Sequence, residues 1–336
     1  MCGTLLVKYF FPNFRDFPKY FPKFLWIILI PSPIFLFFPA LLTLALSLCH
    51  DKAKMCEFCH QHGEGKKWYL NANNYAEDLM SDLRRRQFIT RFFENPGHLA
   101  KGNRALAALD VMPDFLWKGV RNKITAKQQV KHFGQVVPIE DIERILTLTT
   151  SIVRLACICR HVSVGKEQRY CFGVSMEPDG GGIAKLLGEI DASYLVGPHT
   201  AGLETMSKTD ALARMRESEA EGNCHTVWTF VTPFLAGICN CSLPSCYAMK
   251  ATVAHKTPVF FKGEYVARVD ADKCNGCGQC VKLCSFDAFK PRKKKEKAEV
   301  DALKCYGCGI CRSACVKDAI TLVDRAAVPA AASLWL

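Results

Sequence analysis

Glycine and proline are too scarce in this 336-residue chain, at 22 and 16 residues, for a collagen-like or Pro/Gly low-complexity protein. The sequence also lacks a dinucleotide-binding fingerprint, a paired-carboxylate site and a nucleophile triad, so no motif assigns a reaction. The glycine-rich stretch at residues 179–182 lacks the Lys-Ser/Thr ending of a phosphate loop, which argues against nucleotide binding there. Disorder along the whole chain is excluded, because 49% of the residues are hydrophobic.

Acidic residues are in deficit, with 32 Asp and Glu against 44 Lys and Arg, and the formal net charge is +12. A positive field attracts nucleic acids, anionic membrane surfaces and acidic proteins alike, so charge alone does not choose among them. The densest basic run, at residues 292–297, is typical of a solvated hairpin tip and could also dock an acidic redox partner. No aromatic platform accompanies this run, so we expect no nucleic acid.

Residues 24–49 contain no charged side chain and are long enough to cross a bilayer as a helix. Pro31, Pro33 and Pro39 lie inside this run and would disturb such a helix. Two interpretations stay open: residues 1–54 are a transmembrane anchor, or they are an extension of the gene model and translation begins at Met55. We therefore expect a cytoplasmic protein, with membrane association through residues 24–49 as the alternative.

Hydrophobic periodicity and capping residues predict an α+β fold. The pattern predicts helices over residues 73–94, after Pro138, and over residues 207–221, where a serine precedes Asp210 by three positions. A pair of short strands is expected between residues 258 and 269, around Lys262-Gly263. Residues 98–137 give no clear pattern.

An internal repeat with an offset of 31 residues dominates the C-terminal part of the chain. Each copy has the spacing Cys-x2-Cys-x2-Cys-x3-Cys, and both copies begin with the pattern Ala-x-Val-Asp-Ala-x-Lys. The first copy contributes Cys274, Cys277, Cys280 and Cys284, and the second contributes Cys305, Cys308, Cys311 and Cys315. Two copies of one strand-loop-helix unit are therefore expected.

This spacing is typical of iron-sulfur chemistry, in which three thiolates on one loop hold three corners of a cubane and the fourth cysteine of the run reaches the other cluster. Cluster one should take Cys274, Cys277, Cys280 and Cys315, and cluster two should take Cys305, Cys308, Cys311 and Cys284. A zinc ribbon uses the same ligands, but two complete four-cysteine runs at one repeat favour iron.

Residues 264–322 resemble the bacterial-type dicluster ferredoxin domain. The resemblance implies two 4Fe-4S clusters in a small pseudo-twofold β/α fold that moves single electrons. The proline that commonly follows the fourth cysteine is replaced by Ser285 and Val316, which removes no ligand.

Seven more cysteines lie between residues 157 and 246, upstream of the repeat, and six of them form two similar groups. Each group is a Cys-x-Cys pair with a third thiol nearby: Cys157, Cys159 and Cys171, and Cys239, Cys241 and Cys246. Two such groups facing each other could bind a further iron-sulfur cluster or another thiolate-bound metal. Buried free thiols are the alternative, and Cys224, His225 and Arg160 are weaker candidates for the same site. The block 137–246 resembles the upstream part of uncharacterised ferredoxin-domain proteins of anaerobes, which implies no reaction.

Cys56 and Cys59 belong to a Cys-x-x-Cys-His segment that matches the attachment motif of c-type haem. Haem c is disfavoured, because five residues are a weak match. The two thiols could instead join His62 in a metal site, or serve as structural thiols.

These patterns predict four segments: residues 1–54, a mixed cysteine-rich domain at 55–256, a dicluster ferredoxin domain at 257–325 and a tail at 326–336. The expected function is electron transfer to or from a redox protein partner, with two 4Fe-4S clusters and possible further metal upstream. The alternative is an oxidoreductase in which the upstream thiolate site is catalytic and the ferredoxin domain supplies electrons.

Overall fold

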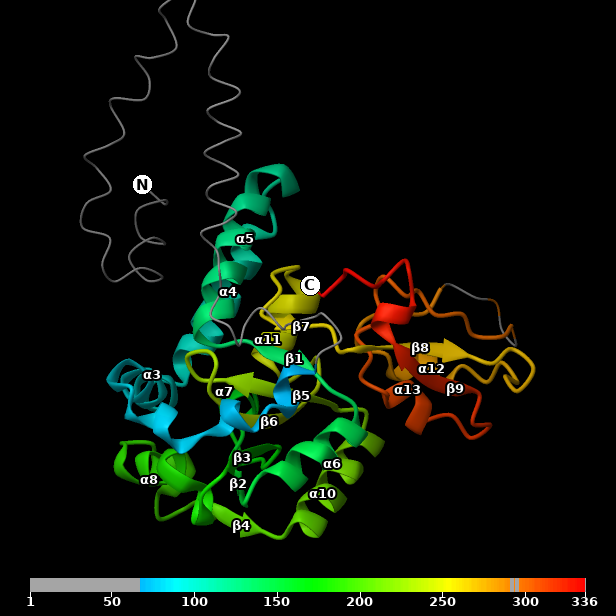
Figure 1. The fold of residues 1–336 in the computed structure, drawn as a ribbon. Coiled ribbons are helices and arrows are strands. Elements are labelled where there is room, and N and C mark those ends of the chain that lie inside the picture. The colour runs from blue at the N-terminus through cyan, green and yellow to red at the C-terminus, as the bar shows by residue number, and fades with distance from the viewer. Residues whose placement is uncertain (1–66, 291–292, 294–295, 336) are drawn as a thin grey trace, which may run out of the picture. The chain divides into compact units, whose positions relative to one another are not determined.

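The computed structural model describes residues 67–290, 293 and 296–335 (Figure 1). All described residues belong to one compact unit. The predicted membrane span at residues 24–49, and Cys56 and Cys59, lie outside the described residues. Within the described ranges, no helix is long and apolar enough to cross a bilayer.

A seven-stranded sheet with the order β4-β2-β3-β6-β5-β1-β7 forms the centre of the upstream part. Neighbouring strands are antiparallel except for β1 and β7, which pair in parallel. The strands are β1 Gly134–Val136, β2 Ser151–Leu155, β3 Cys171–Ser175, β4 Glu204–Met206, β5 Cys224–Thr229, β6 Leu235–Cys241 and β7 Phe260–Phe261.

Helices cover both faces of this sheet. Figure 1 shows α6 and α10 on one side and α3 and α8 on the other, and each pair packs on its own apolar cluster. The α-helices are α3 Leu83–Glu94, α4 Gly97–Leu109, α5 Asp114–Lys131, α6 Ile139–Leu148, α7 Ile158–Val164, α8 Gly181–Glu189, α9 Ser193–Val196, α10 Lys208–Ala220, α11 Tyr247–Met249, α12 Gln279–Leu283 and α13 Ile310–Ser313.

Two of the predicted helices are confirmed. Helix α6 begins directly after Pro138, and Ile142 and Ile145 on its inner face are fully buried against the sheet. Helix α10 begins after Ser207, whose hydroxyl accepts the backbone N–H of Asp210 at 3.1 Å and so satisfies one free donor of the first turn.

The helix predicted over residues 73–94 is wrong in its first half. Residues Ala72–Tyr75 and Glu77–Ser81 form short 3-10 turns, because extended backbone at Ala76 and Asp82 interrupts the chain. Asp82 caps the helix that follows by accepting the backbone N–H of Arg84 at 2.8 Å. The true helix is therefore α3 alone.

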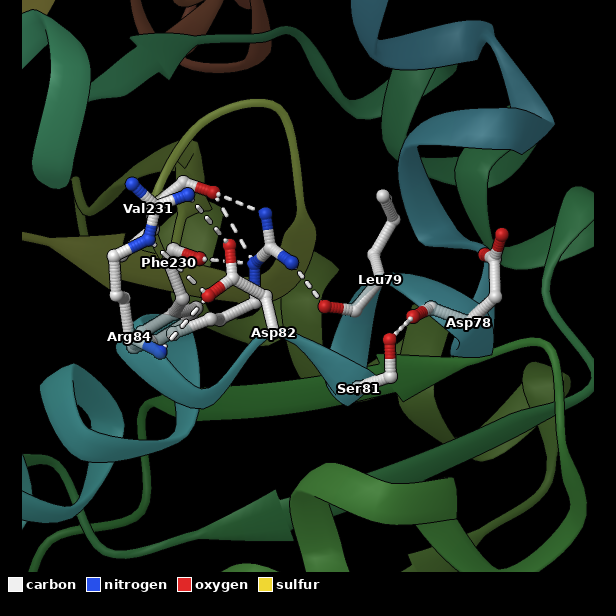
Figure 2. A network of polar contacts seen from close by, with 8 residues as sticks. Asp78, Leu79, Ser81, Asp82, Arg84, Phe230 and Val231 are labelled. Atoms are coloured by element: carbon white, nitrogen blue, oxygen red, sulfur yellow. Dashed lines mark hydrogen bonds and ion pairs between the residues drawn. The ribbon is translucent and has the colours of Figure 1, made fainter.

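A buried arginine attaches α3 to the turn between β5 and β6. The Arg85 guanidinium donates to the carbonyl oxygens of Phe230 at 2.9 Å, of Val231 at 2.9 Å and of Leu79. Figure 2 shows these carbonyls together with the cap formed by Asp82 and Arg84. One cation thus satisfies three backbone acceptors from two distant segments.

The C-terminal part has a small sheet of its own, in which β8 Tyr265–Val269 pairs antiparallel with β9 Ile320–Asp324. Phe289 and Val300 form an isolated antiparallel bridge. The two strands expected between residues 258 and 269 both exist, but they do not pair with each other. β7 joins β1 in the large sheet and β8 joins β9, so the turn around Gly263 connects two sheets.

Polar contacts connect the part of the chain around the large sheet with the part around the small sheet. Asp141 of α6 is fully buried and accepts the hydroxyls of Tyr69 at 2.6 Å and Tyr265 at 3.2 Å. Arg312 of α13 pairs with Glu140 of α6 at 2.5 Å. Together with the mixture of helices and strands, this arrangement confirms the predicted α+β class.

Candidate metal centres

Each cysteine run of the repeat lies on a tight loop that leads into a short helix, α12 or α13. The loops turn at Gly276, Gly278, Gly307 and Gly309, all with φ between 70° and 85°. This backbone region disfavours residues with a Cβ, and at Gly307 an added Cβ would lie 2.2 Å from the Tyr265 carbonyl oxygen. Glycine is therefore required where the loop passes closest to strand β8.

Two cavities of similar size lie in the C-terminal part, and each is lined by four cysteines. The first is lined by Cys274, Cys277, Cys280 and Cys315. The second is lined by Cys284, Cys305, Cys308 and Cys311. In each case three thiols come from one repeat and the fourth comes from the other, which is the exchange that the spacing predicts.

Backbone N–H groups point at the thiols with the symmetry of the repeat. Such donors stabilise thiolates and tune the reduction potential of a bound cluster. Ala267 donates to Cys305 at 3.4 Å and Ala298 to Cys274 at 3.5 Å, while Ala288 donates to Cys284 and Ala319 to Cys315, both at 3.4 Å. The donor set and the cavities thus fit two cubane clusters held by four thiolates each.

The cysteines that line the two cavities differ in their exposure to solvent. Cys277, in the first cavity, is exposed. In the second cavity Tyr306 stacks on Phe286 with ring centroids 4.1 Å apart, and burial raises the pKa of Cys308 to about 12. Metal binding at the second cavity must therefore displace a tightly held proton from this thiol.

Two buried cations lie beside the second cavity. Arg325 is fully buried and donates to the carbonyl oxygens of Gly263, Tyr265 and Cys305 at 2.7 to 2.9 Å. The Lys262 ammonium lies 5.2 Å from the centre of the Tyr306 ring. Burial and repulsion from Arg325 lower the pKa of Lys262 to about 8. Positive charge at this position favours a more negative, reduced cluster.

Sequence reasoning did not identify Lys262 and Arg325 as functional residues. Neither belongs to the repeat, and their position depends on how β7, β8 and the chain after β9 come together. One signal of asymmetry was visible, because the position of Asn275 in the first loop is occupied by Tyr306 in the second. That exchange brings the aromatic cover to only one of the cavities.

Six of the seven upstream cysteines lie together in the structure, and Cys224 lies between them and the C-terminal part. Cys224 faces Cys241 across strands β5 and β6 and belongs to the same apolar cluster as Cys280 and Cys311. His225 is fully buried and its Nδ1 lies 2.6 Å from Asn240 Oδ1, whereas its Nε2 has no hydrogen-bond partner among the described residues.

Comparison with known families places the C-terminal part in a defined class. Residues 273–319 match a family model described as a 4Fe-4S dicluster domain. A search of curated proteins finds no match to the chain. The chain therefore carries a 4Fe-4S dicluster domain at its C-terminal end, as predicted, and is an iron-sulfur protein of the electron-transfer type. The resemblance of the upstream block stays a prediction.

Proposed function

We propose that this protein carries single electrons through two 4Fe-4S clusters. Cluster one is held by Cys274, Cys277, Cys280 and Cys315, and cluster two by Cys284, Cys305, Cys308 and Cys311. The observation that carries this assignment is the pair of cavities, each lined by four thiols drawn from both repeats. The clusters supply one-electron chemistry when bound.

The surroundings of the thiols give the two clusters different tasks. Exposed Cys277 makes cluster one the contact point for a soluble partner. The stacked rings of Tyr306 and Phe286 line the cavity of cluster two, while Lys262 and Arg325 stabilise its reduced form. Electrons are therefore expected to enter the protein at cluster one and to pass to cluster two, whose reduced form is stabilised.

We propose an acidic redox protein as the partner, because the chain is basic and Lys317 lines the cavity of cluster one beside Cys277. Electrostatic attraction of this kind speeds encounter and weakens as salt is added. A reducing compartment such as the cytoplasm suits a chain with this many free thiols. We also propose that the protein associates with a membrane through residues 24–49.

Two single substitutions test the exchange of ligands between the repeats. Cys315→Ser, in the second repeat, should weaken cluster one, and Cys284→Ser, in the first repeat, should weaken cluster two. The measurement is electron paramagnetic resonance of the anaerobically purified, reduced full-length protein, with iron and sulfide analysis. Loss of the cluster formed by the same repeat as the substituted cysteine would contradict the assignment.

An oxidoreductase is the second candidate function. The observation that favours it is the number of upstream thiols, since six exceed the four that close a structural tetrahedral site. A catalytic centre would need an open coordination position, which binding of an exogenous ligand such as cyanide would reveal as a spectral change. A spectrum that does not respond would favour the pure electron carrier.

A further inference from the structure

Six upstream thiols form a closed ring of neighbours. Each thiol shifts the pKa of the next around the ring, and the Sγ atoms of Cys171 and Cys239 lie within hydrogen-bond distance at 3.4 Å. The order is Cys157, Cys159, Cys246, Cys241, Cys239, Cys171 and back to Cys157. We call these residues the thiol ring.

Strand geometry explains why these residues meet. Cys239 and Cys241 are two positions apart on β6 and therefore face the same side of the sheet. Cys171 is the direct partner of Cys239 on the neighbouring strand β3, and their Sγ atoms lie 3.4 Å apart. Cys157 and Cys159 enter from the junction of β2 and α7, and Cys246 directly precedes α11. Four separate segments thus contribute to one site.

The thiol ring lies inside the protein. Cys157, Cys171, Cys241 and Cys246 are each at most 8% exposed, and Cys159 and Cys239 are partly buried. All six are free thiols, and the 3.4 Å between Cys171 and Cys239 is far longer than the roughly 2.05 Å of a disulfide. Six adjacent thiols from distant parts of a sequence are more than packing alone requires.

The arrangement differs from a site for one ion. Within residues 67–290, 293 and 296–335, no three His, Cys, Asp or Glu side chains are arranged to hold a single metal ion. A single tetrahedral ion would bring four sulfurs to about 2.3 Å from one point. Six neighbouring thiols instead suit a polynuclear centre, in which several metal atoms share the ligands.

A buried cation gives a second, independent indication. Arg160 is 9% exposed, and its guanidinium donates to three neutral side chains, those of Gln168, Asn223 and Ser242, at 3.1 to 3.2 Å. It also lies 3.7 Å from the centre of the Tyr170 ring. The carboxylate of Glu221, which accepts hydrogen bonds from Tyr170 at 2.9 Å and Asn223 at 3.0 Å, supplies negative charge close to Arg160, and Arg160 also acts electrostatically on Cys157 of the thiol ring.

We propose that the thiol ring binds a third, polynuclear metal centre of iron-sulfur type, with Arg160 compensating its negative charge. All-thiolate surroundings select soft metals and iron-sulfur clusters. Iron is favoured over zinc by position, because Cys241 and Cys246 share one apolar cluster with Cys284, Cys305 and Cys308 of cluster two. A centre there would share this apolar cluster with cluster two and would exchange single electrons with it. Only the electron exchange with cluster two depends on the proposed function; metal binding by the thiol ring does not.

The test compares metal content in full-length protein purified without oxygen. Iron, zinc and acid-labile sulfide are measured per chain in the wild type, in the ring variant Cys159→Ser/Cys246→Ser, and in Cys224→Ser. The last is a matched control, because Cys224 is equally buried and lies beside the ring without belonging to it. Eight iron atoms are expected from the two C-terminal cubanes.

The proposal predicts iron and sulfide above eight per chain in the wild type and in Cys224→Ser. The ring variant should lose only that surplus and keep the spectrum of the two cubanes. Equal iron in the wild type and the ring variant would overturn the proposal, as would zinc without extra sulfide, or disulfides among the ring cysteines. Failure of the dicluster assignment would appear separately, as absence of the eight iron atoms that the ring variant is expected to retain.

Discussion

Removal of the positive charge at Lys262 should lower the reduction potential of cluster two. Lys262 is buried beside Tyr306, the residue that follows the ligand Cys305, and so its charge acts through a medium of low polarity. Lys262→Met keeps the aliphatic stem and removes only the ammonium group. The variant therefore isolates the electrostatic contribution.

The size of the effect follows from Coulomb's law. At an effective dielectric constant of about 20, a unit charge roughly 8 Å from the added electron contributes about 2 kcal/mol. For a one-electron couple, 1.4 kcal/mol corresponds to about 59 mV, so the expected decrease is on the order of 90 mV. The matched control is Lys317→Met at cluster one, where an exposed charge is screened and the shift should be several times smaller.

The assay is a redox titration of anaerobic protein followed by electron paramagnetic resonance. Because the pKa of Lys262 is about 8, protonation also makes the potential of cluster two depend on pH. The charge is lost as pH rises through this value, so the wild-type potential should fall there, and the variant should lack this step. A shift below about 20 mV, or a shift to higher potential, would refute the reasoning.

Further predictions concern stability. Burial lowers the pKa of His225 to about 4 in the folded protein, so the unfolded state binds more protons between pH 4 and about 6.5, and stability should fall by about 3 kcal/mol as pH decreases across this window. His225→Gln should reduce the pH dependence measured by urea unfolding without abolishing it, because burial also lowers the pKa of His132 to about 4, and an unchanged slope would contradict this expectation. Arg85→Met should cost about 2–4 kcal/mol, because carbonyls of three residues lose their donor. The exposed neighbour Arg84→Met should cost less than about 1 kcal/mol, and equal costs for the two variants would refute this account.

The eight C-terminal cysteines could be predicted as cluster ligands from the sequence because their spacing is local. Three ligands on one loop need no knowledge of the rest of the fold, and the repeat made the exchange of the fourth ligand predictable. Helices α6 and α10 were equally accessible, because their capping residues and apolar faces are contiguous in the sequence.

The sequence indicated that the upstream cysteines could form a metal site, but it did not show which of these thiols lie next to each other. The pairing of Cys171 with Cys239 depends on the register of β3 against β6, which long-range packing decides. Helices α4 and α5 were missed, and in α5 apolar residues such as Phe115 and Val130 are exposed at 79% and 59%, which obscures the amphipathic pattern. The role of Arg325 likewise depends on the tertiary fold.

The most direct test of the central claim is an iron and sulfide count with and without the C-terminal ligands. The variant Cys274→Ser/Cys277→Ser/Cys305→Ser/Cys308→Ser removes two thiols from each cavity. The account predicts that full-length protein prepared without oxygen contains about eight more iron atoms and eight more sulfides per chain than this variant. Equal iron in the two proteins would contradict it.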